Sequence, residues 1–391
     1  MNTKTVEDCN LQGKRVLLRA DYNVPMDKEG NISDFMRIEE SVPTLKYILE
    51  HGASLIILTH LGRPKGQRVA SMSVKPIGAA LEKYLEREVA FDEDIYSAAA
   101  KNLCDSLQPG EVVLMENIRF YPEEEANDPD FAKLLSSFGD VFVNEAFSVD
   151  HRAHASTVGV ADYLPAYMGL LLEKEIAALN KVLHDPARPL MAIIGGAKIS
   201  DKIKILAKLL PIVDKLFIGG GMANTFLAAK GYNMQNSLVE EDRIEMAKEI
   251  LQSEYADKLV LPVDVVAASS FSNDAEYKSV ELKSIPAGWQ GLDIGSKTIE
   301  LFQRELAPAC TILWNGPMGV FEMPNFAVGT KAVAKAVADS SAYSVVGGGD
   351  SSAAIRSIGM EEGIDHISTG GGASLKYLEG KELPGIAVCR G

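Results

Sequence analysis

The sequence predicts an α/β protein with two doubly wound parallel sheets, one in each half of the chain, joined by a hinge helix. Three observations lead to this prediction. The length of 391 residues fits two domains better than one or three, at about 100–200 residues per domain. Short runs rich in Val, Ile and Leu alternate with longer stretches of helical pattern. These runs are almost continuously apolar, as expected for strands that helices cover on both faces.

The predicted strands fall into two sets. The first half contributes the runs Arg15–Ala20, Ser54–Thr59, Glu111–Met115 and Asp140–Val143. The second half contributes Leu190–Ile194, Lys215–Ile218, Lys258–Val263, Thr311–Trp314 and Tyr343–Val346. Between the two sets, the run MGLLLEKEIAALNKVL predicts one long helix, which Asp185-Pro186 ends. This helix is a candidate hinge, although an ordinary crossover helix fits the pattern equally well.

Composition excludes several classes of protein. The chain has 39 Lys and Arg against 54 Asp and Glu, a formal charge of −15, which argues against a general nucleic-acid binder. No run approaches the roughly 18 apolar residues of a membrane-spanning helix. The four cysteines are far apart and form no CxxC pair, so we expect reduced thiols and a cytoplasmic location rather than a disulfide framework or a zinc site.

Glycine clusters distinguish the second half. They follow strand-like runs at Gly195-Gly196, Gly219–Gly221, Gly347–Gly349 and Gly370–Gly372. Such turns let backbone N–H groups and a helix dipole approach a phosphate at the carboxyl edge of a sheet. One cluster is more simply a tight turn, but four together favour a nucleotide site. Neither GxGxxG nor GxxxxGK[ST] occurs, which argues against a dehydrogenase and a P-loop NTPase.

Charged residues accompany these glycines. Lys198 and Lys202 are four residues apart in GGAKISDK, so on a helix they would share one face and repel each other unless an anion lay between them. A solvated surface pair is the simpler alternative. Asp350 follows a glycine triplet and starts a helical run, where it is a candidate N-cap or a ligand of Mg²⁺ on a nucleotide phosphate.

The first half supplies cationic or protonatable side chains soon after strand-like runs: Arg37, His60, Arg63, Arg119 and Arg152. A lone arginine is usually a solvated surface residue. Several at one sheet edge would form a basic bowl for a small, highly charged anion, but the sequence does not show that the strands are neighbours. A nucleotide half combined with an anion half indicates phosphoryl transfer, which needs positioning and charge neutralisation above all.

Eight motifs together resemble the phosphoglycerate kinase family in order and approximate spacing: DYNVP, THLGRP, ENIRFYPEEE, HRAHASTVGVADYLPAYMG, GGAKISDKI, WNGPMGVFE, GGGDS and STGGGASL. The resemblance covers essentially the whole chain. It implies two Rossmann-like domains: residues 1–172, which bind phosphoglycerate and are completed by the tail 376–391, and residues 173–375, which include the linking helix and bind nucleotide. It also implies a monomeric, hinge-closing enzyme that reversibly transfers phosphate between 1,3-bisphosphoglycerate and ADP, giving 3-phosphoglycerate and MgATP.

The resemblance implies roles for individual residues. The phosphoglycerate site would comprise Asp21, Asn23, Arg37, His60, Arg63, Arg119 and Arg152. The nucleotide contacts would be Lys202, Glu322 on the ribose, Gly348, Gly349, Asp350 near Mg²⁺, and Ser351. The transferring phosphoryl group would be flanked by Lys198 and Arg37, with Gly371 and Gly372 at a helix start opposite it.

The stretch NEAFSVDHRAHAS departs from the family pattern. Glu145 and Ser148-Val149-Asp150 stand where we expect Asp and Gly-Thr-Ala, while Arg152 is retained. Nothing in the sequence explains the carboxylate of Asp150 beside an anion site. The alternative function is a catalytically silent phosphometabolite-binding protein on the same fold. Such a protein would be expected to lack Lys198, Arg37 or Asp350, and all three are present.

Overall fold

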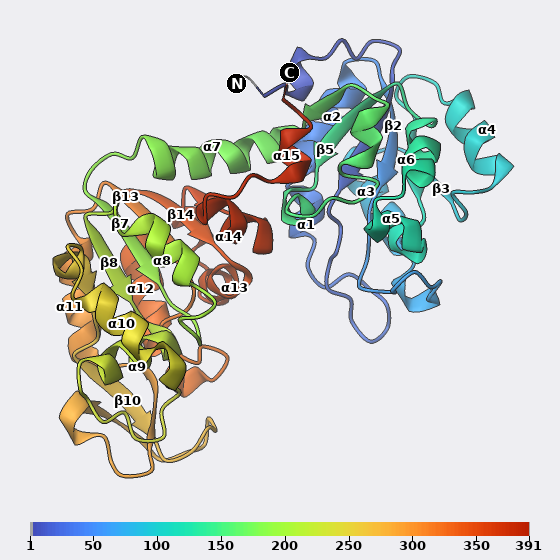
Figure 1. Cartoon of the computed structure of the whole chain (residues 1–391). Helices are drawn as coiled ribbons and strands as arrows, with labels where there is room; N and C mark the ends of the chain where they lie inside the picture. The colour runs from blue at the N-terminus through green and yellow to red at the C-terminus, as the bar shows by residue number, and fades with distance from the viewer. Residues whose placement is uncertain (1–2, 391) are drawn as a thin grey trace. The chain divides into compact units, whose positions relative to one another are not determined.

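The computed structural model describes residues 3–390, and the chain divides into two compact units. The first unit extends to Ala177 and includes the segment from Lys381, and the second is Ala178–Gly380. The boundary lies within helix α7 (Leu170–His184), which extends across the run MGLLLEKEIAALNKVL. In Figure 1, the dark red C-terminal segment with α15 (Pro384–Ala387) lies beside elements of the first unit.

The first unit is built on a parallel sheet of six strands in the order β3-β4-β2-β1-β5-β6. Its strands are β1 (Arg15–Ala20), β2 (Ser54–Leu58), β3 (Val89–Asp92), β4 (Val112–Met115), β5 (Val141–Glu145) and β6 (Ala166–Met168). Its helices besides α15 are α1 (Met36–Glu39), α2 (Val42–Glu50), α3 (Lys75–Leu85), α4 (Ala98–Ser106), α5 (Pro122–Ala126) and α6 (Pro129–Ser136). The four strands predicted for this half are confirmed, whereas the short β3 and β6 were not predicted.

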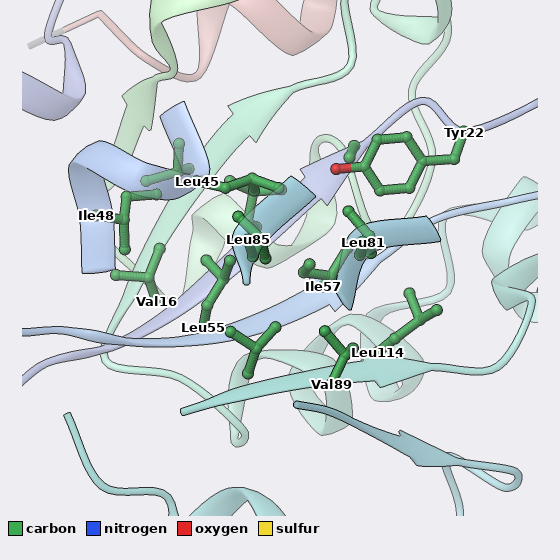
Figure 2. Close-up of a cluster of buried hydrophobic side chains, with 14 of the residues drawn as sticks. Val16, Tyr22, Leu45, Ile48, Leu55, Ile57, Leu81, Leu85, Val89 and Leu114 are labelled. Atoms are coloured by element: carbon green, nitrogen blue, oxygen red, sulfur yellow. The ribbon is translucent and has the colours of Figure 1, made fainter. Parts of the chain in front are cut away.

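Both faces of this sheet are buried, which explains the continuous apolar runs. On one face, Val16, Leu55 and Ile57 pack against side chains of α2 and α3, as Figure 2 shows. The alternate strand residues, such as Leu17 and Ile56, are also fully buried on the opposite face. A parallel sheet with helices on both sides therefore leaves no polar face for its central strands.

The second unit repeats this plan with the strand order β15-β14-β13-β7-β8-β9. The strands are β7 (Leu190–Ile194), β8 (Lys215–Ile218), β9 (Leu259–Val260), β13 (Thr311–Asn315), β14 (Tyr343–Gly347) and β15 (His366–Ile367). The helices are α8 (Ile203–Leu209), α9 (Gly220–Ala229), α10 (Ile244–Leu251), α11 (Ser296–Leu306), α12 (Val328–Ala338), α13 (Gly349–Ser357) and α14 (Gly372–Leu378). None of the helices within residues 3–390 is both long and apolar enough to cross a membrane.

A three-stranded antiparallel sheet in the second unit was not predicted. It has the order β11-β10-β12, formed by β10 (Asp264–Ala268), β11 (Tyr277–Glu281) and β12 (Gln290–Ile294). The prediction of a strand over Lys258–Val263 is wrong beyond its first residues, because only Leu259–Val260 pairs with the main sheet. Pro262 lacks an N–H group for a ladder, and the chain then leaves for the small sheet.

Glu145 holds the first turn of α7 in place through hydrogen bonds. Its buried carboxylate accepts hydrogen bonds from the backbone N–H groups of Leu171 (3.1 Å) and Leu172 (3.2 Å), and Thr44 donates its hydroxyl to the same carboxylate. These N–H groups belong to the helix end that has no partners within the helix. Burial raises the pKa of Glu145 to about 7.

Asp150 holds the C-terminal segment against the first unit. It is fully buried, and its Oδ1 accepts a hydrogen bond of 2.8 Å from the Asn144 amide. The same amide donates to the carbonyl of Gly385 at 2.9 Å, and the Gly385 N–H donates to the Asp150 carbonyl at 3.1 Å. A Cβ at Gly385 would lie 2.2 Å from Asp150 Oδ1, so this close approach requires glycine.

The variant Asp150→Asn is expected to reduce the loss of stability at alkaline pH. Burial raises the pKa of Asp150 to about 7, so the folded chain keeps a proton that the unfolded chain, with a pKa of about 3.9, has already released. Stability therefore falls as pH rises from about 4 to about 7 and stays lower above that range. The neutral amide should stabilise the chain at pH 8 by on the order of a few kcal/mol, since one pKa unit corresponds to about 1.4 kcal/mol.

Urea unfolding at pH 5.5 and pH 8 measures this effect. Asp130→Asn, at an exposed position on α6, is the matched control. The buried carboxyls of Glu145 and Asp293, whose pKa values burial also raises to about 7, should preserve part of the pH dependence. Equal losses of stability between the two pH values in Asp150→Asn and the control would contradict the prediction.

Candidate active site

The sheet order of the first unit brings the expected anion-binding residues to one edge. Asp21 directly follows β1, His60 follows β2, Arg119 lies beyond β4, and Arg152 lies beyond β5. The strands β4, β2, β1 and β5 are consecutive neighbours and all run parallel. Their carboxyl ends therefore meet at one edge, where open α/β sheets bind ligands.

Asp21 is the centre of the contacts at this edge. Its side chain is 8% exposed and forms an ion pair with Arg37, which comes from α1. Oδ1 accepts a hydrogen bond from the Asn23 N–H at 3.1 Å and lies 3.8 Å from His60 Nδ1. Oδ2 accepts the hydroxyl proton of Ser148. The structure thus brings Asp21, Arg37 and His60 into direct contact.

The loop after β2 joins the remaining residues to this group. Asn23 Oδ1 accepts a hydrogen bond of 2.8 Å from the Gly62 N–H, and Arg119 Nη1 donates to the Gly62 carbonyl at 3.0 Å. Arg63 follows Gly62 in the chain and is exposed. The loop therefore places the Arg63 backbone beside Asn23 and Arg119.

The cationic side chains at this sheet edge repel each other and are poorly solvated, as the pKa shifts of their neighbours indicate. Burial and the charges of Arg19 and Arg119 lower the pKa of His60 well below its ordinary value. Burial, followed by Arg19 and Arg119, lowers the pKa of His154 to about 4, and burial with the charge of Arg19 lowers that of Arg119 to about 10. Arg119 Nε and His154 Nδ1 are buried without a hydrogen-bond partner. An anion at this edge would stabilise the arginine charges and offset the repulsion between them.

Sequence reasoning missed the buried layer beneath this edge. Arg19 is fully buried, donates from Nε to Ser156 Oγ at 2.9 Å and contacts His60 Nδ1 through Nη2 at 3.1 Å. Glu124, also fully buried, accepts hydrogen bonds from the N–H (2.9 Å) and hydroxyl (2.6 Å) of Ser156. The available signal was Arg19, which follows three consecutive apolar residues in the strand run RVLLRA.

At the carboxyl edge of the second main sheet, the glycines bring three loops into contact. A Cβ at Gly195 would lie 2.1 Å from the Pro317 carbonyl oxygen, and one at Gly316 would lie 2.2 Å from the Gly195 carbonyl oxygen. Gly316 also has a φ of 99°. The loops after β7, β8 and β13 can approach this closely only without side chains. These glycines therefore serve loop packing as well as exposing backbone N–H groups.

A cavity of about 710 Å³ lies beside these loops. Glu322 and Asp350 line it, together with glycines of the loops and the apolar side chains Leu238, Phe271, Met318 and Val320. The Phe271 side chain is conspicuous because the residue is 62% exposed. Apolar walls with a few acidic groups at the edge are typical of a site for a polar aromatic ligand.

The turn after β14 positions the remaining expected nucleotide residues. Gly348 is the N-cap of α13, Gly349 begins that helix, and Asp350 lies in its first turn, so Asp350 is not the N-cap. Ser351 is buried, and its hydroxyl accepts the Gly316 N–H at 2.6 Å. That hydroxyl therefore supports the loop after β13. Gly371, with a φ of 47°, is the N-cap of α14, and Gly372 begins it.

The prediction that Lys198 and Lys202 share one face of a helix is wrong. Helix α8 begins at Ile203, with Lys202 as its N-cap, and Lys198 lies in the preceding loop with an exposed side chain. Lys202 Nζ instead donates to Asn315 Oδ1, and burial lowers its pKa although Asp350 and Asp201 oppose this shift. Asn315, fully buried at the end of β13, was missed as an individual residue although it lies in the motif WNGPMGVFE.

The described part of the chain offers few side chains that could act together as ligands of a metal ion. Within residues 3–390, no three His, Cys, Asp or Glu side chains are grouped so that they could hold a metal ion. The exposed carboxylate of Asp350 at the cavity is nevertheless compatible with Mg²⁺. This ion is usually held by one or two carboxylates together with substrate phosphates and water.

Comparisons with known proteins agree along the whole chain. A family model described as phosphoglycerate kinase matches residues 6–381. Phosphoglycerate kinases from Chloroflexus aggregans and Moorella thermoacetica are 51% and 52% identical, over 99% and 98% of both chains respectively. Solved structures of phosphoglycerate kinases from Coxiella burnetii and Pyrococcus horikoshii have TM-scores of 0.90 and 0.85, at 40% and 36% identity, and each covers 99% of this chain and at least 98% of its own. Since one family accounts for both sheets and both sets of loops, this chain belongs to the phosphoglycerate kinase family.

Proposed function

We propose that this chain catalyses the reversible transfer of a phosphoryl group between 1,3-bisphosphoglycerate and ADP, giving 3-phosphoglycerate and ATP. Membership of the family supports the reaction. The observation that carries the proposal is the group of arginine and histidine side chains at the edge of the first sheet. In it, Arg119 Nε and His154 Nδ1 are buried without a hydrogen-bond partner and have only the longer contacts to Glu125 (3.5 Å) and Glu124 (3.8 Å). In a chain with a charge of −15, such a cluster indicates a specific anion site.

The phosphoglycerate site of this proposal lies in the first unit. Arg63, Arg119 and Arg152 would bind the phosphate that does not react, because guanidinium groups bind phosphate bidentately. Asp21 and Asn23 would bind the glycerate part, with His60 held between Asp21 and Arg19. Burial and neighbouring cations keep His60 neutral at physiological pH.

The nucleotide site lies in the second unit. The apolar walls of the cavity would receive the base, and Glu322 would bind the ribose. The turn Gly348–Ser351 and Lys202 would bind the phosphates, with Asp350 and the substrate phosphates as ligands of Mg²⁺. The bound ion would neutralise charge on the phosphate oxygens during transfer.

Around the reacting phosphoryl group, this proposal places Arg37 from the first unit and Lys198 from the second. The N–H groups that follow Gly371 and Gly372 would lie opposite them. Charged groups at these places stabilise the charge that is spread over the phosphoryl oxygens during transfer. No side chain is needed as a general base, because a carboxylate oxygen of the substrate is the nucleophile of the reverse reaction.

We also propose a cytoplasmic monomer. The free cysteines Cys9, Cys104, Cys310 and Cys389 favour a reducing compartment. Every residue assigned a role comes from one copy of the chain. An assay that follows ATP formation from ADP, Mg²⁺ and 1,3-bisphosphoglycerate tests the function, and binding of both ligands without turnover would instead support the silent phosphometabolite-binding protein.

Lys198→Ala is expected to lower kcat by roughly 10²-fold or more, as for the loss of one preorganised electrostatic donor. The KM values should change much less, because the exposed Lys198 is proposed to act on the transition state. Steady-state kinetics with both substrates measures this split. Lys331→Ala, at an exposed position on α12, is the control, and an unchanged kcat for Lys198→Ala would reject the role.

Arg152→Ala is expected to weaken 3-phosphoglycerate binding by about tenfold or more while leaving ADP binding nearly unchanged. The guanidinium is an exposed member of the cation group in the first unit, and its charge lowers the pKa of His154. Loss of one charge-assisted contact accounts for this magnitude. Titration calorimetry with each ligand measures it, with Arg87→Ala as a control for arginine removal elsewhere in the unit. A loss of ADP affinity alone would reverse the assignment of the two units.

The two units are expected to close about α7 when both ligands are bound. The proposed ligand sites lie in different units, and direct transfer requires the reacting atoms to approach to about 3–3.5 Å. Small-angle scattering of the free, singly liganded and doubly liganded protein measures compaction, with 3-phosphoglycerate and ADP as a pair that does not react. A radius of gyration that stays the same in all states would reject closure.

A further inference from the structure

Ser148 occupies a defined place at the edge of the first sheet. It lies in the 3-10 turn η4 (Phe147–Val149), which follows β5. Its neighbours Phe147 and Val149 are both buried, whereas Ser148 itself is partly exposed. The turn is therefore fixed by apolar packing on both sides of the serine, and its shape does not depend on the hydroxyl.

The hydroxyl connects two residues of the proposed phosphoglycerate site. Ser148 Oγ donates its proton to Asp21 Oδ2 and lies 3.5 Å from Arg37 Nη1. Arg37 also forms an ion pair with the same carboxylate oxygen. Asp21, Arg37 and Ser148 thus form a closed triangle in which the hydroxyl can donate to one member and accept from the other.

The contacts within this triangle affect how Arg37 can bind a substrate. In the structure, the guanidinium of Arg37 is held by Asp21, so turning it toward an anion weakens that ion pair. Asp21 is nearly buried, and a buried carboxylate oxygen that loses its donor is costly. The Ser148 hydroxyl keeps Oδ2 hydrogen-bonded while Arg37 turns, just as the Asn23 N–H keeps Oδ1 hydrogen-bonded.

We propose that Ser148 is a positioning residue, whose hydroxyl holds the Asp21 carboxylate in place while Arg37 moves to the phosphoglycerate. This inference rests on the proposed function. It assigns a purpose to one departure from the family pattern, since the glycine expected at this position has no hydroxyl. In this chain, the hydroxyl lowers the free-energy cost of turning Arg37 away from Asp21 and toward the anion.

Ser148→Ala tests the proposal because it removes only the hydroxyl. We expect the KM for 3-phosphoglycerate to rise about tenfold, in line with the loss of one hydrogen bond to a charged group, while kcat and the KM for ATP stay within about twofold. Ser148→Thr keeps the hydroxyl and should restore the KM. Ser148→Gly, which places the residue of the family pattern here, should behave like Ser148→Ala.

A double-mutant cycle separates positioning from a direct contact with substrate. If Ser148 acts through Asp21, adding Ser148→Ala to Asp21→Asn should produce little further change in KM. Ser137→Ala is the matched control, because this exposed hydroxyl donates only to the Leu134 carbonyl at the end of α6. Thermal unfolding of each variant shows whether the fold is retained.

Three results would overturn the inference: an unchanged KM in Ser148→Ala, an equal rise in the KM for both substrates, or a full additional effect in the Asp21→Asn background. These results are distinct from a failure of the proposed function. If the unmodified chain forms no ATP, the function is wrong. If it is active and Ser148→Ala matches it, only the role of Ser148 is wrong.

Discussion

Cationic side chains buried together at the carboxyl edge of the first sheet impose the main constraint on that unit. Arg19 is completely buried, Arg119 lies close to it, and the charges of both help to keep the neighbouring His60 neutral. Taking such charges out of water costs several kcal/mol each unless partners compensate. Glu124 and Asp150 raise the pKa of Arg19 against the effect of burial, and Asp21 pairs with Arg37. The buried acidic groups therefore offset the charge of Arg19 below the sheet edge. Donor atoms of the arginines at that edge remain available to an anion.

The buried charge of Arg19 gives a physical reason for a carboxylate at position 150. Arg19 lowers the pKa of Asp150 and Asp150 raises that of Arg19, so their attraction offsets part of the larger cost of burying both groups. The same short stretch also contains Glu145, which caps α7, and Ser148, which bonds to Asp21. The stretch 145–150 thus contacts Asp21 of the proposed anion site, the helix α7 and the C-terminal segment of the first unit.

The proposed nucleotide site of the second unit depends on backbone groups more than on charged side chains. Its glycine turns pack against each other without side chains and leave backbone N–H groups at the sheet edge. Cationic side chains are few there: Lys202 is largely buried against Asn315, and Lys198 is exposed in a loop. Such a site suits a ligand that brings its own metal ion. The proposed anion site of the first unit relies instead on arginine side chains, which lie beside neutral histidines.

The sequence by itself determined the fold class and most of the central strands, because a strand buried on both faces must be apolar along its whole length. It also indicated the family, because motifs such as THLGRP and GGAKISDKI resemble that family in order and spacing along the chain. Edge elements such as β6 and β11 were not determined, because β6 has only three residues and β11 is mostly exposed, so neither forms a long apolar run. Only the tertiary structure decided that Arg19 and Glu124 lie beneath the proposed anion site, that Lys202 bonds to Asn315, and that Ser148 bonds to Asp21. These contacts join residues far apart in the chain, and their partners depend on strand order and register, which local sequence patterns do not encode.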